Sequence, residues 1–154
     1  MLGGKTMQER NLTIYFTSDL HSYIYPTDYR SQEEKDLGLF KCASQFQKDG
    51  NTLVIDGGDL LQGSPLGAFC HDTVGSAAQF AQIMNRCGYD YVTLGNHDFN
   101  YGMPYLDSYL DALRARCVCE NVRWAGGGVR FPARVHVLEN GLRIGIVGIV
   151  TDYV

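Results

Sequence analysis

The chain has 154 residues, of which 45% are hydrophobic and 19% charged, and its formal net charge is −4. This length fits one globular domain, which can bury roughly 70% of its unfolded surface without a disulfide framework. The acidic balance disfavours a protein that binds a nucleic-acid polymer, because such proteins normally present a basic stripe. We find no apolar run long enough for a membrane span and no hydrophobic signal segment at the N-terminus, so the sequence leaves cytoplasmic and extracytoplasmic locations open.

Strands and helices are expected to alternate through the first part of the chain. The β-branched and aromatic run 12–16 predicts a strand, which a long polar loop over 22–36 follows. Apolar residues at helical spacing then predict a helix from 37 to about 49, and a short apolar run at 52–55 predicts a buried strand. An irregular loop containing Gly63, Pro65 and Gly67 is expected before a helix over 74–86, with Asp72 or Thr73 as its N-cap and Gly88 as its end.

The second part of the chain changes from alternating elements to a hairpin. We predict a strand at 91–94, a helix at 104–113 and a strand at 117–119. Two further strands at 135–138 and 142–147 flank Asn140-Gly141, which favours a type I′ hairpin turn. The alternation indicates an α/β fold with a largely parallel first sheet.

Acidic, histidine and amide side chains follow three successive strands at the point where each ends. Because the carboxyl ends of parallel strands lie along one edge, these residues should meet in one cleft. They would form a mixed oxygen and nitrogen site suited to Mn, Fe or Zn, in which a cation relieves the repulsion between the carboxylates. Two such metals bridged by the central carboxylate can activate water for displacement at phosphorus. The residues are Asp19, His21, Asp59, Asn96, His97 and Asp98.

Each of these signals is weak alone, because acidic and glycine-rich segments also cap strands and form turns. Their order and their places after three strands make the metal site the better interpretation. The segments Ser18-Asp19-Leu20-His21, Gly57-Gly58-Asp59 and Gly95-Asn96-His97-Asp98 resemble the first three motifs of the calcineurin-like metallophosphoesterases. The flanking residues, 58–66, 95–102 and 140–148, resemble the branch that contains the 5′-nucleotidases and the 2′,3′-cyclic-nucleotide phosphodiesterases.

This resemblance covers about residues 12–151 and implies an αββα sandwich with two divalent metal ions. It implies that Asp19 and His21 bind one metal, that Asp59 bridges, and that Asn96 binds the second. His97, paired with Asp98, would be the catalytic histidine. The implied reaction is hydrolysis of nucleotide phosphate esters by metal-activated water, with a modest leaning toward the cyclic phosphodiesterase and 3′-nucleotidase side.

Two departures from the family pattern stand out. Ser22 occupies a position where many members have glycine, which affects only the local loop geometry. The two downstream metal-binding motifs of the family are missing, and neither His71 nor His136 stands in such a context. We therefore interpret residues 1–11 as an extension and 12–154 as the N-terminal portion of a catalytic domain, without its C-terminal portion or substrate domain. Alone, this portion should be weakly active or inactive, and we expect it to self-associate through the edge of its C-terminal strand, 142–147.

Two other functions stay open. A non-catalytic binding or assembly module could keep the scaffold with an incomplete metal site. A flavodoxin-like or Rossmann nucleotide-binding domain also alternates strands and helices, but the chain has no G-x-G-x-x-G after its first strand. The tyrosines Tyr23, Tyr25 and Tyr29 are expected to anchor the loop over 22–36 rather than to form a base-stacking lid.

Overall fold

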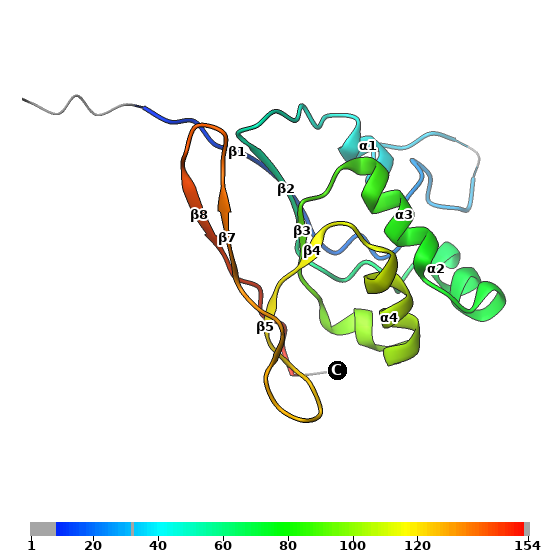
Figure 1. Ribbon diagram of the computed structural model, residues 1–154. Helices are drawn as coiled ribbons and strands as arrows, with labels where there is room; N and C mark the ends of the chain where they lie inside the picture. The colour runs from blue at the N-terminus through cyan, green and yellow to red at the C-terminus, as the bar shows by residue number, and fades with distance from the viewer. Residues whose placement is uncertain (1–8, 32, 153–154) are drawn as a thin grey trace, which may run out of the picture.

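The computed structural model describes residues 9–31 and 33–152, so most of the predicted extension over 1–11 lies outside the described residues. Four strands form a parallel sheet in the order β1 (Thr13–Thr17), β2 (Thr52–Asp56), β3 (Tyr91–Val92) and β4 (Arg116–Cys117). Their carboxyl ends share one edge, as the alternation predicted (Figure 1). The α/β class with a parallel first sheet is confirmed.

Helices cover one face of this sheet and a β-hairpin covers the other (Figure 1). The helices are α1 (Leu39–Ala43), α3 (Ala78–Cys87) and α4 (Met103–Ala112), and the hairpin consists of β7 (Arg134–Val137) and β8 (Arg143–Ile146). Alternation along β2 serves both layers: Val54 packs in the core beneath the helices, whereas Leu53 packs on the hairpin side. Both side chains are fully buried, which explains why the sequence of β2 is a continuous apolar run.

The prediction of an irregular loop around Gly63, Pro65 and Gly67 is wrong in part. The chain forms α2 (Pro65–Phe69) there, and one π-helical turn (Cys70–Val74) follows it. Ser64 caps α2 by accepting a hydrogen bond from Gly67 N–H, and Pro65 fits the first helical turn. The following helix starts at Ala78, later than predicted, since Gly75 adopts a left-handed conformation that ends the π turn. Gly88 ends it as expected.

The predicted helix over 37–49 is far shorter, since α1 stops at Ala43. Phe46 still packs against the sheet, but from non-helical backbone: its ring centroid lies 5.0 Å from that of Tyr15 and 5.8 Å from that of Tyr89. The Tyr15 hydroxyl also accepts a hydrogen bond from Gln47 N–H. Tertiary contacts with Tyr15 of β1 and with Tyr89, which precedes β3, therefore hold this segment outside a helix.

The predicted strand at 117–119 divides into β4 and β5 (Cys119–Arg123), and β5 pairs with β6 (Val129–Phe131) in a hairpin that the local sequence pattern did not indicate. The turn between β7 and β8 also differs from the prediction. Gly141 has a φ of 79° while Asn140 does not have positive φ, which excludes type I′. Gly141 N–H donates to Leu138 C=O, a pattern that fits a type I turn followed by a left-handed glycine.

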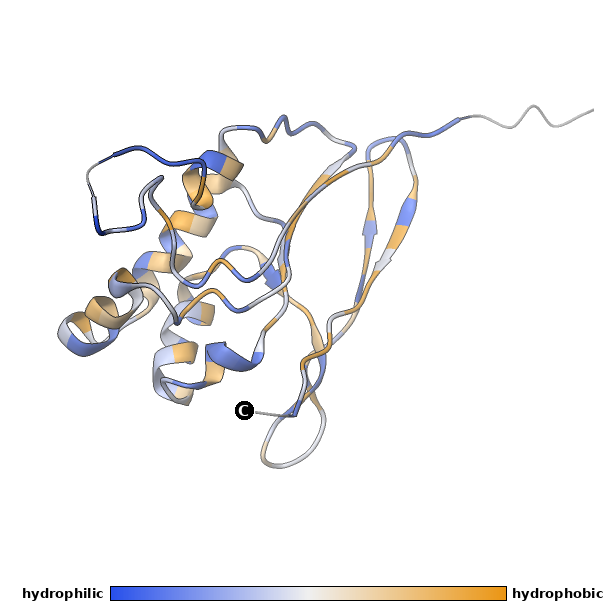
Figure 2. Ribbon diagram, turned by 180° about the vertical axis from the view of Figure 1, so that it is seen from behind, coloured by the Kyte–Doolittle hydropathy of each residue, from blue (hydrophilic) through white to orange (hydrophobic). Residues whose placement is uncertain are grey.

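The loop after β1 is hydrophilic along most of its length (Figure 2). Its tyrosines hold it in place: the Tyr23 and Tyr29 rings lie 5.7 Å apart, and Tyr25 packs edge-on against Phe40 of α1. The Tyr29 hydroxyl accepts a hydrogen bond from Ile24 N–H. These contacts support the anchoring role. Within the described residues, none of the helices has the length and apolar character that a membrane crossing requires.

Candidate metal centre

Three loops meet at the carboxyl edge of the parallel sheet, and backbone hydrogen bonds join them. Asp19 N–H donates to Gly58 C=O and His21 N–H donates to Asp59 C=O, each at 2.9 Å, which fixes the loop after β1 on the loop after β2. His97 N–H donates to the Asp59 carboxylate at 2.8 Å, which joins the loop after β3 to the same point. The strand ends separated by about 40 residues in sequence are thus brought into one site.

Asp19, His21 and Asp59 each offer one ligand atom, and these atoms all lie within 4.8 Å of one another. The Asp19 side chain is exposed, whereas His21 and Asp59 are partly buried. The His21 Nδ1 lies 2.7 Å from Gln62 C=O, so the ring donates there and turns Nε2 toward Asp19, 3.9 Å away. Such a bond to the far nitrogen is the usual support of a metal-binding histidine. The donor set of carboxylates and imidazole fits a divalent cation.

The backbone of these ligands is strained. Asp19, His21 and Asp59 have φ values of 54°, 47° and 58°, in the left-handed region that side chains rarely adopt. Ser22, with φ 61°, also lies there, which explains why glycine suits this position. The Ser22 hydroxyl offsets the strain by donating to Leu60 C=O while the side chain is fully buried.

Two glycines allow the loops after β2 and β3 to touch. A Cβ on Gly58, whose φ is +94°, would lie 2.3 Å from Gly95 N. A Cβ on Gly95 would lie 2.1 Å from the Asp59 carboxylate. Any side chain at either position would force the loops apart and displace Asp59.

His97 lies at the rim of the cluster, with its ring centroid 5.4 Å from that of His21. The Asn100 side-chain amide lies 3.0 Å from His97 Nδ1 and also donates to Gln62. Because an amide N–H donates to Nδ1, the neutral ring carries its proton on Nε2. Asn96 begins the short 3₁₀ helix (Asn96–Phe99) and directly precedes His97, whose N–H donates to the Asp59 carboxylate.

The expected pairing of Asp98 with His97 is not found, because no hydrogen bond joins these two side chains among the described contacts. Its buried carboxylate accepts four backbone N–H bonds, all between 2.9 and 3.0 Å, from Asp59, Leu60, Leu61 and Gly95. Burial raises the pKa of Asp98, and the bonds from Gly95, Leu61 and Asp59 oppose that rise. Asp98 therefore holds the loop after β2 and the loop after β3 together.

Gln62 and Asn100 were not singled out from the sequence, although both lie inside the quoted motif segments. Asp56, at the end of β2, was also missed; only its place in Asp56-Gly57-Gly58-Asp59 could have indicated it. Its buried carboxylate accepts hydrogen bonds from Thr17 Oγ at 2.6 Å and from Gly58 N–H at 3.0 Å.

His71 and His136 lie outside the candidate metal cluster. The His71 ring stacks on Tyr101, and His136 is hydrogen bonded to the Tyr91 hydroxyl.

Asp56 predicts an unusual pH dependence of stability. Burial raises the pKa of Asp56 to about 7, against roughly 3.9 in an unfolded chain. Between about pH 4 and 7 the folded state therefore holds the extra proton, and the free energy of unfolding should fall as the pH rises through this window. Urea unfolding at pH 5 and pH 8 with chelator present measures this change. Asp56→Asn should reduce this fall in the free energy of unfolding, whereas Asp72→Asn, at an exposed site, should leave the fall unchanged. An equal fall in the wild type and both variants would contradict the assignment of the effect to Asp56.

The fold and this cluster define an α/β protein with a candidate metal site at the edge of its parallel sheet. The family model for the calcineurin-like phosphoesterases matches residues 12–149, so the chain belongs to this family. It is 35% identical to the trifunctional nucleotide phosphoesterase YfkN of Bacillus subtilis over 91% of this chain and 11% of that protein. The solved YfkN structure superposes with a TM-score of 0.72 at 32% identity, covering 90% of this chain and 48% of that chain.

Two further relatives carry nucleotide phosphoesterase names. The chain is 34% identical to a 2′,3′-cyclic-nucleotide 2′-phosphodiesterase/3′-nucleotidase of Yersinia enterocolitica, over 73% of this chain and 18% of the relative. It is 30% identical to the 5′-nucleotidase of Rattus norvegicus, over 93% of this chain and 27% of the relative. The chain thus spans only about a tenth to a quarter of the length of these relatives.

Proposed function

We propose that this chain is the metal-binding N-terminal portion of a phosphoesterase that hydrolyses nucleotide phosphate esters. The observation that carries the proposal is the convergence of Asp19, His21 and Asp59 within 4.8 Å at the sheet edge. The names of the relatives support a nucleotide as the alcohol part of the ester, including 5′, 3′ and 2′,3′-cyclic phosphates.

Asp19 and His21 would hold one divalent ion, Asp59 would bridge to a second, and Asn96 would complete that second site. Bound divalent ions would supply positive charge that activates water and neutralises phosphate oxygens. The His97 ring, with its proton on Nε2, can donate that proton to the leaving alkoxide or to a phosphoryl oxygen. Asn100 and Gln62 orient the His97 and His21 rings for these roles.

Turnover of 5′-AMP, 3′-AMP and 2′,3′-cyclic AMP with added Mn²⁺ tests this function. We would assay the chain alone and the chain joined to the downstream catalytic segment of YfkN, after circular dichroism confirms that both are folded. We expect turnover in the joined protein, little in the chain alone, and a loss of at least about 100-fold on His97→Ala. His71→Ala should leave turnover unchanged. If the folded joined protein hydrolyses none of the three esters, the proposal fails.

A non-catalytic binding or assembly module is the second candidate, favoured because the described cluster holds only three acidic or histidine ligands. Calorimetric titration of the chain with Mn²⁺ separates the two. Tight binding of two ions per chain would exclude the non-catalytic module, whereas no binding, combined with inactivity of the joined protein, would favour it.

The isolated chain should self-associate through an open apolar face. Ile14 and Phe16 of β1 are 50% and 64% exposed, and Val147 and Ile149, which follow β8, are 66% and 72% exposed. Among the residues 9–31 and 33–152, no strand pairs with the outer edge of β1 and β8 pairs only with β7, so both offer free edges. Light scattering should show dimers or larger species. Phe16→Ser with Ile149→Ser should weaken association by at least about tenfold, while Val74→Ser, exposed elsewhere, should not; a monodisperse wild-type monomer would contradict this expectation.

A further inference from the structure

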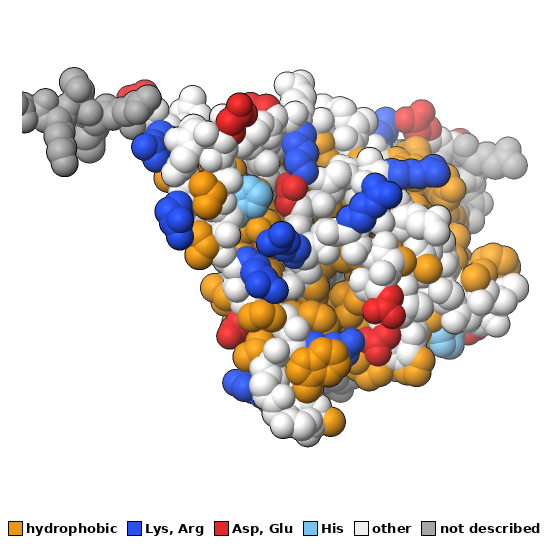
Figure 3. Space-filling view, viewed as in Figure 1, with side chains coloured by type: hydrophobic (Ala, Val, Ile, Leu, Met, Phe, Trp, Pro, Cys, Tyr) orange, Lys and Arg blue, Asp and Glu red, His pale blue; other side chains and the backbone are white. Residues whose placement is uncertain are grey.

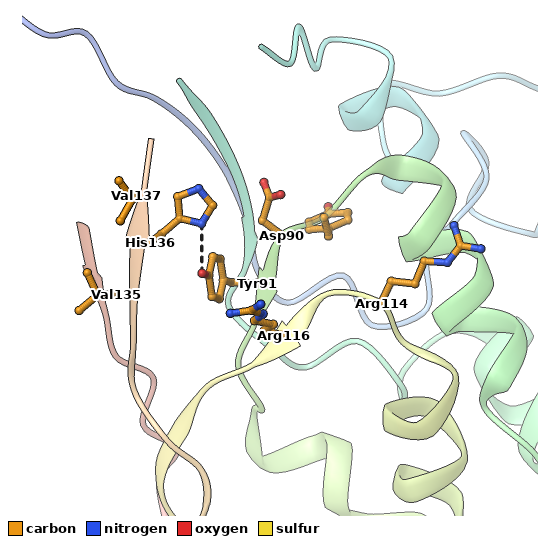
Figure 4. Close-up of a pocket in the computed structure, with 8 residues that line it drawn as sticks. Asp90, Tyr91, Arg114, Arg116, Val135, His136 and Val137 are labelled. Carbon is orange, nitrogen blue, oxygen red and sulfur yellow. Dashed lines mark hydrogen bonds between the residues drawn. The ribbon is translucent and has the colours of Figure 1, made fainter. Parts of the chain in front are cut away.

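Arginines line a continuous hollow on the side of the sheet away from the metal centre. A cavity of about 360 Å³ lies where β3 and β4 begin, and Arg114, Arg116 and His136 line it (Figure 4). A neighbouring cavity of about 250 Å³ shares Arg116 and adds Arg130 and Arg134. A third, of about 300 Å³, shares Arg114 and adds Arg86. We call this surface the arginine groove; it consists of Arg86, Arg114, Arg116, Arg130 and Arg134.

The positive charge of the groove is largely uncompensated. Among the described residues only Arg130 of these five forms an ion pair, with Asp107 at 2.5 Å, and its buried Nε still lacks an acceptor. Asp90 lies in the groove, but Lys48 already pairs with it at 2.6 Å. Lys and Arg side chains accordingly gather across the middle of this face (Figure 3). In a chain of net charge −4 this is a marked segregation of charge.

The shape of the groove selects an extended ligand. The Tyr91 hydroxyl and His136 are hydrogen bonded at 3.1 Å and hold β7 against β3. Arg116 lies beside Tyr91, whereas Arg114 extends away from this pair toward α3 (Figure 4). A compact anion bound at the Tyr91–His136 pair would not contact both Arg116 and Arg114. A ligand that binds both arginines must therefore extend along the groove.

Apolar side chains and free strand edges accompany the arginines. Leu113 and Phe131 line the adjoining cavity, whereas the side chains of Val135 and Val137 in β7 point away from the arginines, on the face opposite to His136 (Figure 4). In the part of the chain that the structure describes, β7 pairs with β8 alone and β4 is the last strand of the parallel sheet. Such edges accept an added strand, whose side chains then meet the flanking pockets.

We propose that the arginine groove binds an extended acidic polypeptide segment, with carboxylates on the arginines and apolar side chains on Leu113 and Phe131. Arginine is suited to this role because its planar guanidinium binds carboxylate in a bidentate manner. The apolar contacts that Leu113 and Phe131 offer favour a peptide over a nucleic acid, and the chain's acidic net charge disfavours a phosphate polymer. The groove lies at the amino ends of β3 and β4, so this binding is independent of the proposed hydrolysis.

Fluorescence anisotropy with a labelled peptide of about twelve alternating glutamates and valines tests the proposal. We expect saturable binding to the 154-residue chain, weakened at least about tenfold by Arg114→Ala with Arg116→Ala. Arg123→Ala, which removes an exposed arginine outside the groove that has no ion pair with any described residue, is the matched control and should change the affinity less than about twofold. A lysine and valine peptide should not bind.

Three results would overturn the proposal. The first is no saturable binding of the glutamate peptide, and the second is equal weakening by the groove and control variants. The third is tighter binding of a single-stranded oligonucleotide of equal charge, which would assign the groove to nucleic acid instead. Circular dichroism of each variant excludes unfolding as the cause, and Arg116→Lys, which keeps the charge without the planar fork, should retain only part of the affinity.

Discussion

Replacing Asp98 by alanine should lower the free energy of unfolding by about 3–5 kcal/mol, because a buried carboxylate that satisfies several backbone donors would be lost. Its four partners include Asp59, a candidate metal ligand, and Gly95, which precedes Asn96. The donors left behind are themselves in a region that water reaches poorly, since Leu60 and Leu61 are almost fully buried. Urea unfolding in the presence of chelator measures the effect.

Asp72→Ala is the control for this experiment, because Asp72 is a 73% exposed carboxylate beside His71 and should cost less than about 0.5 kcal/mol. Asp98→Asn keeps one acceptor oxygen and should fall between the two. If Asp98→Ala were no more destabilising than Asp72→Ala, Asp98 would not hold the loops together. A protein with intact stability but altered reaction pH dependence would instead point to the pairing with His97 that the family resemblance implied.

The second large effect is expected at Asp59. Its carboxylate is at once a member of the three-ligand cluster and the acceptor for His97 N–H. Asp59→Asn preserves the volume and that hydrogen bond but removes the negative charge and one ligand oxygen. We expect the affinity for Mn²⁺, measured by calorimetry, to fall at least about 100-fold, equivalent to about 2.7 kcal/mol.

Asp49→Asn is the matched control, because Asp49 caps a turn before β2, where it accepts hydrogen bonds from Asn51 and Thr52 at a distance from the cluster. It should leave Mn²⁺ affinity unchanged. Unchanged affinity in Asp59→Asn would show that Asp59 is not a ligand. Equal weakening by both substitutions would show that the effect reflects general charge rather than the site.

The two effects address different properties of the same loops. Asp98 acts through backbone donors, so its loss should appear in stability with or without metal. Asp59 acts through its own carboxylate, so its loss should appear in metal affinity while the fold persists. Measuring both quantities on both variants separates the framework of the site from its ligands.

Local sequence patterns predicted much of the fold correctly. The buried β2 run, the pattern of α4 and the left-handed Gly88 at the end of α3 are all local signals, because spacing and backbone conformation are encoded within a few residues. The prediction of the segment after α1 failed, because Phe46 satisfies helical spacing yet packs on Tyr15 and Tyr89 from another backbone conformation. The pattern did not predict the capped helix α2, because glycine and proline are typical helix-breaking residues. Ser64 and Pro65 are nevertheless also typical of the start of a helix.

The sequence by itself determined the composition of the candidate site, because Asp19, His21, Asp59 and Asn96 each follow a strand and parallel strands share one edge. Only the tertiary structure decided the contacts of Asp98, whose carboxylate binds backbone of two loops that are far apart in the chain. It also revealed that arginines from separate elements line one groove, and that four of the five form no ion pair among the described residues. The physical reason is the same in both cases: hydrogen-bond partners and charge neighbours depend on packing between distant segments, which residue spacing along the chain does not record.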